Sequence, residues 1–446
     1  MKIVIVIPPR VDGRWVGRED KHGGFGRITI PYTACQIHSM IKRDLPEAKI
    51  KILECQRDEL NRDEALERLE KMRPDVVVCF LSWAQLNNDR ALAETNFPTI
   101  GVILQQFIDQ REAVEHYDLR CNWFTKQEVE QPIIKGLREI ACTGNILKTP
   151  GFIVRTNQGS LKDTGNVSPA DMTTFPMPSF DAFKLEKYFS LRRKAGLPEP
   201  VKIHLNTMKG CLYRCSFCGQ ANRGQGVRTQ SVSQVGRQIR FLIKRYDVTN
   251  FLFFDNEFAV DMERAKGLCM EFIKLPKPIR FEINNRVELF DNSLINLLAE
   301  AGCIGVRCGI ETCDPVTQAV LKKRINLEAA RKTLRDIKAT GMRVHLYMTP
   351  GIPGETRKTL DMNARFIAEV DADTFSYGAL SLMPNSDFYN EYKKKGWINE
   401  QDWSVYFSQS KLCFKNSSYN SMEEIRKAQQ YMLSQVEVFK KQNRIA

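Results

Sequence analysis

The segment "KIHLNTMKGCLYRCSFCGQ" (residues 202–220) joins a strand-like run to three closely spaced cysteines, Cys211, Cys215 and Cys218. Three residues separate the first pair and two separate the second, with no fourth cysteine nearby. A structural zinc site would need a fourth ligand, and His204 would have to leave its strand to supply it. Thiolates are the ordinary ligands of iron–sulfur clusters. The loop therefore favours such a cluster, with one coordination position left open.

Length and composition indicate a globular protein of two or three domains. The chain has 446 residues, of which 43% are hydrophobic and 27% charged. No apolar run reaches the roughly 18–20 residues that span a bilayer. The opening "MKIVIVIPPR" predicts a first strand rather than a signal peptide. We therefore expect a cytoplasmic enzyme with no membrane span.

The remaining cysteines and the net charge are less informative. Thirteen cysteines, an odd number without a compact disulfide framework, indicate a reducing compartment. Those outside the loop are expected to pack as small apolar side chains. The net charge of +13 is dispersed, with no basic tract interleaved with aromatic residues. A solvated basic surface is the expected reading, and nucleic acid is the less favoured partner.

The first 145 residues alternate between strand-like and helix-like segments. Strands are predicted at 2–8, 49–55, 75–83 and 99–104, with helices at 29–45 and 62–74. This order predicts a doubly wound α/β domain over residues 1–145, with a parallel sheet whose ligands bind beyond the carboxyl ends of its strands. Ser82 and Trp83 fall at such an end.

The rest of the chain divides into three predicted regions. Residues 146–200, with a small hairpin and a Pro-interrupted stretch, are expected to form a connector. Residues 201–385 contain six strand-like runs, most of them separated by helical stretches, and predict a partial (βα)6 barrel. Residues 386–446 are expected to form a helical C-terminal region. The cysteine loop would follow the first barrel strand, at the end where such barrels place their chemistry.

Other polar residues are predicted at the carboxyl ends of later barrel strands. Asp255 and Glu257 in "FFDNEF" share one face because side chains alternate along a strand. Their carboxylates can hold an ammonium group, or they are solvated acids of a turn. In "GVRCGIET", Arg307, Gly309 and Glu311 share a face, and Gly309 allows a ligand close to the backbone.

These features resemble the radical S-adenosylmethionine (SAM) superfamily, whose hallmark is C-x3-C-x-aromatic-C after the first strand of a six-unit partial barrel. Phe217 supplies the aromatic residue. The resemblance implies a [4Fe–4S] cluster on the three cysteines, with the open iron chelating S-adenosylmethionine. Reductive cleavage would give methionine and a 5′-deoxyadenosyl radical, with electrons from a donor such as flavodoxin or ferredoxin.

The resemblance also assigns roles to the strand-end residues. Asp255 and Glu257 match the position that contacts the amino group of S-adenosylmethionine. Arg307, Gly309 and Glu311 match the fourth-strand segment, where a carboxylate commonly meets the ribose or the amino acid portion. The stretch "TPGIPGET" (349–356), which includes Ile352, looks like a segment of the superfamily that suits backbone contact with adenine.

The domain order resembles the cobalamin-binding-domain branch of the superfamily, which includes methyltransferases of unactivated carbons and an anaerobic cyclase. One expected feature is missing, because "ECQRDEL" (54–60) contains no cobalt-binding histidine. Cobalamin binding without a histidine ligand and a domain that does not use cobalamin both remain open. Ser82 and Trp83 would line the lower face of a corrin, or Trp83 would anchor a domain interface. "HGGFGR" (22–27) would contact a phosphate or a corrin side chain, or form a flexible turn.

The leading hypothesis is a radical SAM enzyme that abstracts hydrogen from an unactivated carbon for cobalamin-dependent methylation. The first alternative is a cobalamin-independent cyclisation, coupling or rearrangement of a small molecule or peptide. A second is radical modification of RNA, which would be accompanied by another cysteine cluster. Cys35, Cys55 and Cys79 are about 20 residues apart on separate predicted elements, which disfavours that reading. A non-enzymatic scaffold is the least favoured.

Overall fold

The structure, a computed structural model, describes residues 1–11, 14–15, 28–104, 110–126, 128–197, 201–220, 226–400 and 402–445. Its contacts divide the chain into two compact units, Met1–Val201 and Lys202–Ala446. Among the described helices, none combines the length and apolar character needed to cross a membrane.

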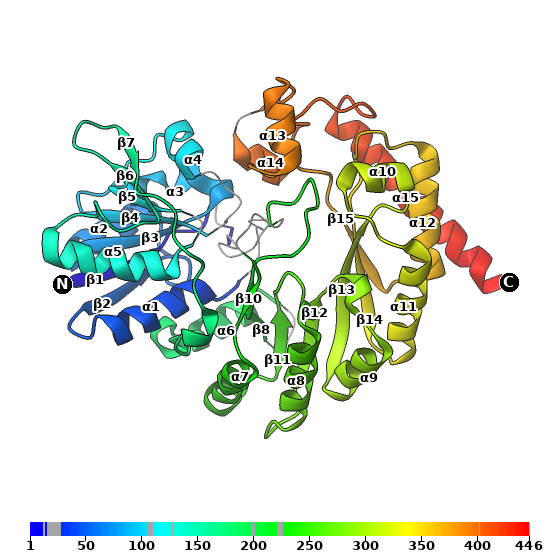
Figure 1. Ribbon diagram of the computed structural model, residues 1–446, viewed down its shortest axis with the longest axis horizontal. Coiled ribbons are helices and arrows are strands. Elements are labelled where there is room, and N and C mark those ends of the chain that lie inside the picture. Colours follow the sequence, from blue (N-terminus) through cyan, green and yellow to red (C-terminus); the bar gives the residue numbers. More distant parts are fainter. Residues whose placement is uncertain are drawn as a thin grey trace. The chain divides into compact units, whose positions relative to one another are not determined.

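The first unit is built on one seven-stranded sheet with the order β2-β1-β3-β4-β5-β6-β7 (Figure 1). Its strands are β1 (Lys2–Ile7), β2 (Lys49–Glu54), β3 (Val76–Leu81), β4 (Thr99–Ile103), β5 (Trp123–Thr125), β6 (Phe152–Arg155) and β7 (Leu161–Asp163). The first five strands pair in parallel, whereas β6 pairs antiparallel with β5 and β7 pairs antiparallel with β6. β3 and β4 are buried along their whole length, which is typical of the inner strands of a parallel sheet covered on both faces.

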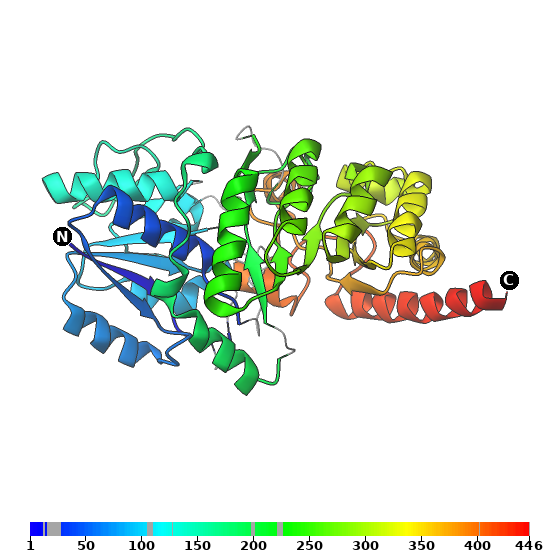
Figure 2. The ribbon, with the colours of Figure 1, turned by 90° about the horizontal axis from the view of Figure 1, so that it is seen from below.

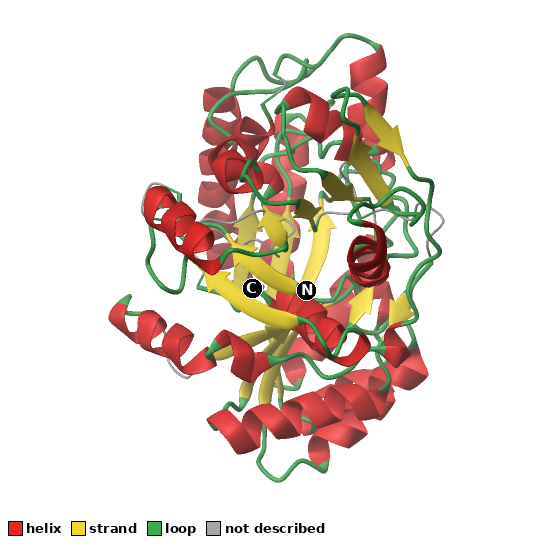
Figure 3. Cartoon of the chain, turned by 90° about the vertical axis from the view of Figure 1, so that its left-hand side faces the viewer, coloured by secondary structure: helices red, strands yellow, loops and turns green. Residues whose placement is uncertain are grey.

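Helices alternate with most of these strands along the chain, and Figure 3 draws the helices in red and the strands in yellow. They are α1 (Tyr32–Asp44), α2 (Arg62–Met72), α3 (Leu86–Ala93), α4 (Gln110–His116), α5 (Glu130–Thr143) and α6 (Leu185–Lys194), with short 3₁₀ turns at Trp83–Gln85, Met172–Thr174 and Phe180–Phe183. Local signals fix their ends. Asn61 and Glu64 form a reciprocal capping box at the start of α2. Pro31 is the N-cap of α1, which begins three residues later than predicted.

The stretch at 146–200 packs as part of the first unit. The predicted hairpin is present as β6 and β7 and extends the sheet. The Pro-interrupted stretch then lies against α1, where the Ser179 amide donates to the Cys35 carbonyl at 3.0 Å and Gln36 donates to the Pro176 carbonyl at 2.8 Å. These hydrogen bonds satisfy backbone groups that an irregular segment would otherwise leave exposed.

The second unit contains six parallel strands in sequential order, which form the predicted partial barrel. They are β8 (Lys202–Leu205), β11 (Asn250–Phe253), β12 (Arg280–Asn284), β13 (Cys303–Glu311), β14 (Arg343–Met348) and β15 (Thr374–Tyr377). The short antiparallel pair β9 (Met208–Lys209) and β10 (Arg228–Thr229) lies at the carboxyl end of β8. Figure 1 shows helices along the outer face of the curved sheet.

These helices are α7 (Val232–Tyr246), α8 (Met262–Ile273), α9 (Asn292–Glu300), α10 (Pro315–Leu321), α11 (Leu327–Ala339) and α12 (Arg357–Glu369), with a 3₁₀ turn at Val287–Leu289. Phe253, Phe272 and Phe281 pack between sheet and α8, with ring centroids 5.2–5.7 Å apart. Aromatic pairs of this kind contribute roughly 0.5–1.5 kcal/mol beyond their buried area.

The C-terminal region adds α13 (Asp387–Lys394), α14 (Trp403–Ser408) and α15 (Met422–Ile445). The long α15 packs against α12 and is drawn in red in Figure 2. Tyr377 of β15 donates to the Met432 sulfur of α15 at 3.0 Å, so this side chain faces the helices and not the barrel interior.

Candidate active site in the barrel

The cysteine loop begins with a turn that only glycine fits. Gly210 has a φ of +85°, and a Cβ there would lie 2.1 Å from the Gly226 carbonyl oxygen. Asn256, just after β11, donates to the Gly210 carbonyl at 2.6 Å. The backbone before the first cysteine is therefore constrained by the close approach of Gly226 and by the hydrogen bond from Asn256.

Ser216 anchors the middle of the loop. Its amide donates to the Leu321 carbonyl at 3.0 Å and its hydroxyl donates to the Val320 carbonyl at 2.8 Å, both at the end of α10. Its own carbonyl accepts the Phe388 amide at 2.9 Å. The loop between Cys215 and Cys218 is thus held by the barrel and by the start of α13.

The cysteine sulfurs have polar neighbours. Backbone amides of Tyr213 and Gln220 lie 3.4 and 3.3 Å from the sulfurs of Cys211 and Cys218. The Cys211 thiol donates to Glu257 at 3.0 Å. Burial, and then the Glu257 carboxylate, raise the pKa of this thiol. Iron must therefore displace a proton when it binds Cys211.

Arg286, just after β12, contacts the second cysteine. Its Nη1 lies 3.7 Å from the Cys215 sulfur. Its Nε is buried and has no hydrogen-bond partner in the part of the chain that the structure describes. An unused, buried N–H on a guanidinium that reaches Cys215 fits a cluster whose sulfur atoms accept hydrogen bonds.

Within the described residues, no group of three or more His, Cys, Asp or Glu side chains is arranged to hold one metal ion. His204, the fourth zinc ligand considered above, lies in β8 and stacks on Phe254 with centroids 5.8 Å apart. A [4Fe–4S] cluster places each cysteine on a different iron, so its thiols need not converge on one point.

Asp255 is buried and accepts hydrogen bonds from the residues that lead into the cysteine loop. Its carboxylate accepts the Thr207 amide at 2.7 Å, the Thr207 hydroxyl at 2.5 Å and the Met208 amide at 3.1 Å. Arg264 of α8 adds a hydrogen bond to the same hydroxyl oxygen at 2.8 Å. The structure thus gives Asp255 a positioning role, and its contact with an amino group stays a prediction, as does that of Glu257.

Glu311 and Gly309 lie together at the end of β13. A β-bulge separates them, and Glu311 has a φ of +66°, a rare and strained conformation for this residue. The Glu311 carboxylate accepts from Lys323 at 3.3 Å and from Thr349 at 2.6 Å. A Cβ on Gly309 would lie 2.4 Å from that carboxylate and 3.0 Å from the Lys323 nitrogen, so a larger residue would require this ion pair to shift.

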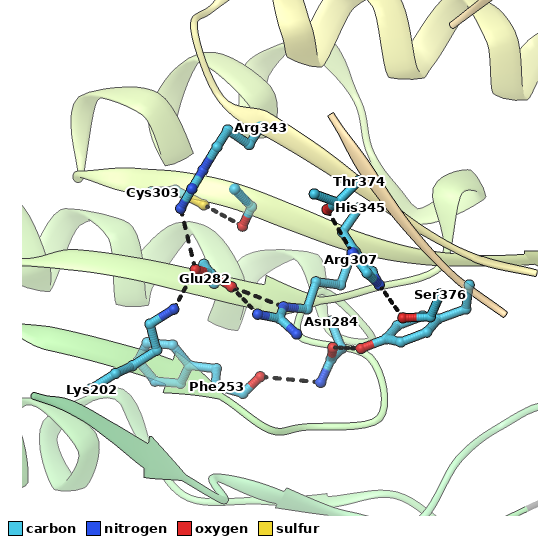
Figure 4. Close-up of polar contacts among 12 residues, drawn as sticks. Lys202, Phe253, Glu282, Asn284, Cys303, Arg307, Arg343, His345, Thr374 and Ser376 are labelled. Atoms are coloured by element: carbon cyan, nitrogen blue, oxygen red, sulfur yellow. Dashed lines mark hydrogen bonds and ion pairs between the residues drawn. The ribbon is translucent and has the colours of Figure 1, made fainter. Parts of the chain in front are cut away.

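Arg307 lies nearer the amino end of β13 than Gly309 and Glu311, and its side chain points to the buried carboxylate of Glu282. Figure 4 shows Glu282 between Lys202, Arg307 and Arg343, at N···O distances of 2.5, 2.5 and 3.5 Å for the closest atoms. Beside them, His345 contacts two hydroxyls of β15, and burial followed by the charge of Arg307 lowers its pKa to about 4. Arg307 is therefore part of a polar network inside the barrel, and its cofactor contact stays a prediction.

The loop "TPGIPGET" follows β14 and is tied to the C-terminal region. Ile352 is fully buried, and the Tyr419 hydroxyl donates to Glu355. Asn416 donates to the Gly351 carbonyl at 2.7 Å. Burial raises the pKa of Glu355 to about 7. In the cysteine loop, Phe217 precedes Cys218 and its side chain is half-buried.

At the carboxyl edge of the first unit, Ser82 and Trp83 are both buried. The Ser82 amide donates to Asp89 at 2.8 Å, which caps the turn after β3. Among the described residues, the hydroxyls of Ser82 and of Thr125 at the end of β5 are buried without a hydrogen-bond partner. Residues 22–27, the glycine-rich segment, lie outside the described residues.

Sequence reasoning gave no site role to Arg286 or Lys323. Both follow elements that lead to the carboxyl end of the barrel. The signal that points to Arg286 is its place just after β12, at the end of a barrel strand, as for Asp255 and Glu257 after β11.

The comparisons with known proteins agree with this geometry. Residues 205–367 match the family described as the radical SAM superfamily. The chain is 25% identical over 258 residues to a cytidylyl-2-hydroxyethylphosphonate methyltransferase of Streptomyces wedmorensis, covering 54% of this chain and 48% of the relative. It is 22% identical over 365 residues to an anaerobic magnesium-protoporphyrin IX monomethyl ester cyclase of Rubrivivax gelatinosus, covering 76% and 62%. The chain thus spans about half to three fifths of the length of these curated relatives.

Solved structures share the fold of both units. The radical SAM methyltransferase TsrM of Kitasatospora setae, with tryptophan and a SAM analogue bound, superimposes with a TM-score of 0.72 at 20% identity, covering 88% of this chain and 76% of that one. The cobalamin-dependent radical SAM enzyme OxsB, with aqua-cobalamin bound, gives a TM-score of 0.66 at 14% identity, covering 92% and 56%.

The second unit is a radical SAM domain, and the predicted α/β architecture is confirmed. The chain as a whole shares the two-unit fold of the solved structures of TsrM and OxsB. The domain implies a [4Fe–4S] cluster and S-adenosylmethionine, and it requires a reductant and a substrate.

Proposed function

We propose that this chain is a radical SAM enzyme that abstracts hydrogen from an unactivated carbon and methylates it with the help of cobalamin. The observation that carries the proposal is the three-cysteine loop, fixed at the carboxyl end of the first strand of a six-stranded parallel barrel. Cys211, Cys215 and Cys218 would hold the cluster, and S-adenosylmethionine would supply the radical. The barrel residues orient the reactants and exclude water.

Cobalamin, when bound, carries the methyl group that is transferred. Two observations favour a ligand at the edge of the first unit: the buried hydroxyls of Ser82 and Thr125 without partners among the described residues, and the parallel strands that end there. The side chains of the segment that lacks the histidine bond to one another. Glu54 accepts a hydrogen bond from the Arg57 amide, and Arg57 forms an ion pair with Asp58 at 2.7 Å. Any cobalamin would therefore bind without a protein ligand from this segment.

The proposal predicts that added cobalamin allows a second reaction of S-adenosylmethionine, the transfer of its methyl group, which leaves S-adenosylhomocysteine. The full chain would be reconstituted anaerobically with iron and sulfide, then incubated with S-adenosylmethionine and a strong reductant, with and without hydroxocobalamin. We expect 5′-deoxyadenosine in both samples, and S-adenosylhomocysteine at least tenfold higher with cobalamin. Absence of 5′-deoxyadenosine would contradict the radical function, and no cobalt retained after gel filtration would contradict the methyl carrier.

The second candidate is a radical cyclisation, coupling or rearrangement without cobalamin. It is favoured by the missing histidine and by the cyclase among the relatives, which matches 76% of this chain. This candidate predicts 5′-deoxyadenosine without cobalamin-dependent S-adenosylhomocysteine. The substrate is proposed to be a small molecule or peptide, and the reductant a flavodoxin or ferredoxin.

A further inference from the structure

Arg286 is a buried cation that touches the cysteine loop at two points. The residue is 6% exposed. Its guanidinium carbon lies 3.9 Å from the centre of the Tyr213 ring, two residues after Cys211, and its Nη1 lies 3.7 Å from the Cys215 sulfur. One side chain thus contacts both halves of the loop.

Contacts outside the loop hold this guanidinium in place. Its Nη2 donates to Glu288 at 2.8 Å and to the Lys323 carbonyl at 3.0 Å. Glu288 lies in the turn after β12, and Lys323 follows α10. The position of the charge is therefore set by the barrel before any cluster is bound, which is the condition for an electrostatic effect without a cost of reorganisation.

The carboxylates near Arg286 and Lys323 neutralise these two cations to different extents. Lys323, 8% exposed, pairs with Glu311 at 3.3 Å, while Arg286 pairs with Glu288, whose side chain is 32% exposed. The carboxylate opposite Arg286 is thus closer to water than the guanidinium, and Nε–H has no acceptor among the described residues. A positive charge within about 4 Å of a sulfur is weakly screened in such a buried site.

We propose that Arg286 is a positioning residue that raises the reduction potential of the cluster held by Cys211, Cys215 and Cys218. A cluster that gains an electron becomes more negative, so a fixed cation and N–H donors near its sulfurs stabilise the reduced form. The Tyr213 contact keeps the loop at the distance this effect requires. The inference rests on the cluster binding of the proposed function, but not on cobalamin or on the substrate.

The test is a redox titration of the full chain, reconstituted anaerobically and followed by the electron paramagnetic resonance signal of the reduced cluster. Arg286→Met removes the charge, and Arg286→Lys keeps it. Arg331→Met is the matched control, because Arg331 also lies over an aromatic ring, Phe366, and pairs with nearby glutamates, but touches no cysteine of the loop.

We expect Arg286→Met to lower the ratio of reduced to oxidised cluster at a fixed potential at least tenfold, about 59 mV for one electron. Arg286→Lys should stay within about threefold of the wild type, and Arg331→Met should not differ from it. Iron content is measured on each sample. Full iron in Arg286→Met with an unaltered potential would overturn the inference.

Two further outcomes are decided by the same samples. If Arg286→Met does not retain iron, Arg286→Gln is compared with Arg286→Lys, and equal potentials in that pair would overturn the inference. If the wild type takes up no iron, the cluster assignment and this inference both fail. A normal potential shift without any effect of cobalamin would contradict only the methyl carrier.

Discussion

At the scale of single residues, glycines and buried carboxylates shape the site before any cofactor is present. Gly210 permits the turn into the cysteine loop, and Asp255 anchors the base of that loop through Thr207. Glu311 adopts a strained backbone conformation to place its carboxylate beside Lys323. Strain of this kind is concentrated at functional sites.

Gly210→Ala is predicted to displace the loop and to reduce the iron bound after reconstitution by more than half. The reason is the 2.1 Å approach of the Gly226 oxygen to the Cβ position, a backbone atom that has little freedom to move. Gly341→Ala is the control, since Gly341 has the same φ of +85° and open space around its Cβ position. The control should lose about 1–2 kcal/mol of stability, because a side chain is unfavourable at this left-handed φ, and it should keep its iron. Equal iron in both variants would contradict the role of Gly210.

Residue types and spacing predict the three cysteines as cluster ligands, because that chemistry depends on local sequence. Other contacts could not be predicted. The partners of Arg286 lie in the loop, in the turn after β12 and after α10, and only the folded barrel brings them together. The hydrogen bonds of Asp255 to Thr207 were not predicted, because period-two alternation shows which face a side chain is on and not which residue it contacts.

At the scale of elements, the C-terminal region supports the loop that follows β14. Ser417 and Ser418 accept the Gly354 amide at 3.1 and 3.0 Å, and Tyr419 bonds Glu355. These contacts link residues more than 60 positions apart in the sequence. Apolar periodicity predicted the strands and helices well, but it carries no information about such polar contacts between loops.

The buried Glu355 predicts a pH-dependent stability. Burial raises its folded pKa from 4.5 to about 7, so the folded chain keeps a proton that the unfolded chain releases above about pH 4.5. Relative to Glu355→Gln, the wild type should therefore lose stability as pH rises from 4.5 to 7, by about 3 kcal/mol in total, and show no further loss above pH 7. Chemical denaturation at several pH values would measure this. A difference independent of pH would contradict the assignment.

At the scale of the whole molecule, the order of elements was the most predictable property. The alternation of strand-like and helix-like segments predicted β1 to β4 and the six barrel strands, and the barrel strands follow one another in sequence order. The sequence did not show that the stretch after residue 145 belongs to the first unit, because its hairpin joins the sheet through antiparallel pairing with β5. Short strands of three or four residues carry little periodicity.

The central claim is that three cysteines bind a [4Fe–4S] cluster and leave one iron open to S-adenosylmethionine. The most direct measurement is the electron paramagnetic resonance spectrum of the anaerobically reconstituted, reduced full chain, before and after addition of S-adenosylmethionine. We expect about four irons per chain and a spectrum that changes on addition. Both should be absent when Cys211, Cys215 and Cys218 are all replaced by alanine. An iron-free wild type, or a cluster signal that S-adenosylmethionine leaves unchanged, would contradict the account.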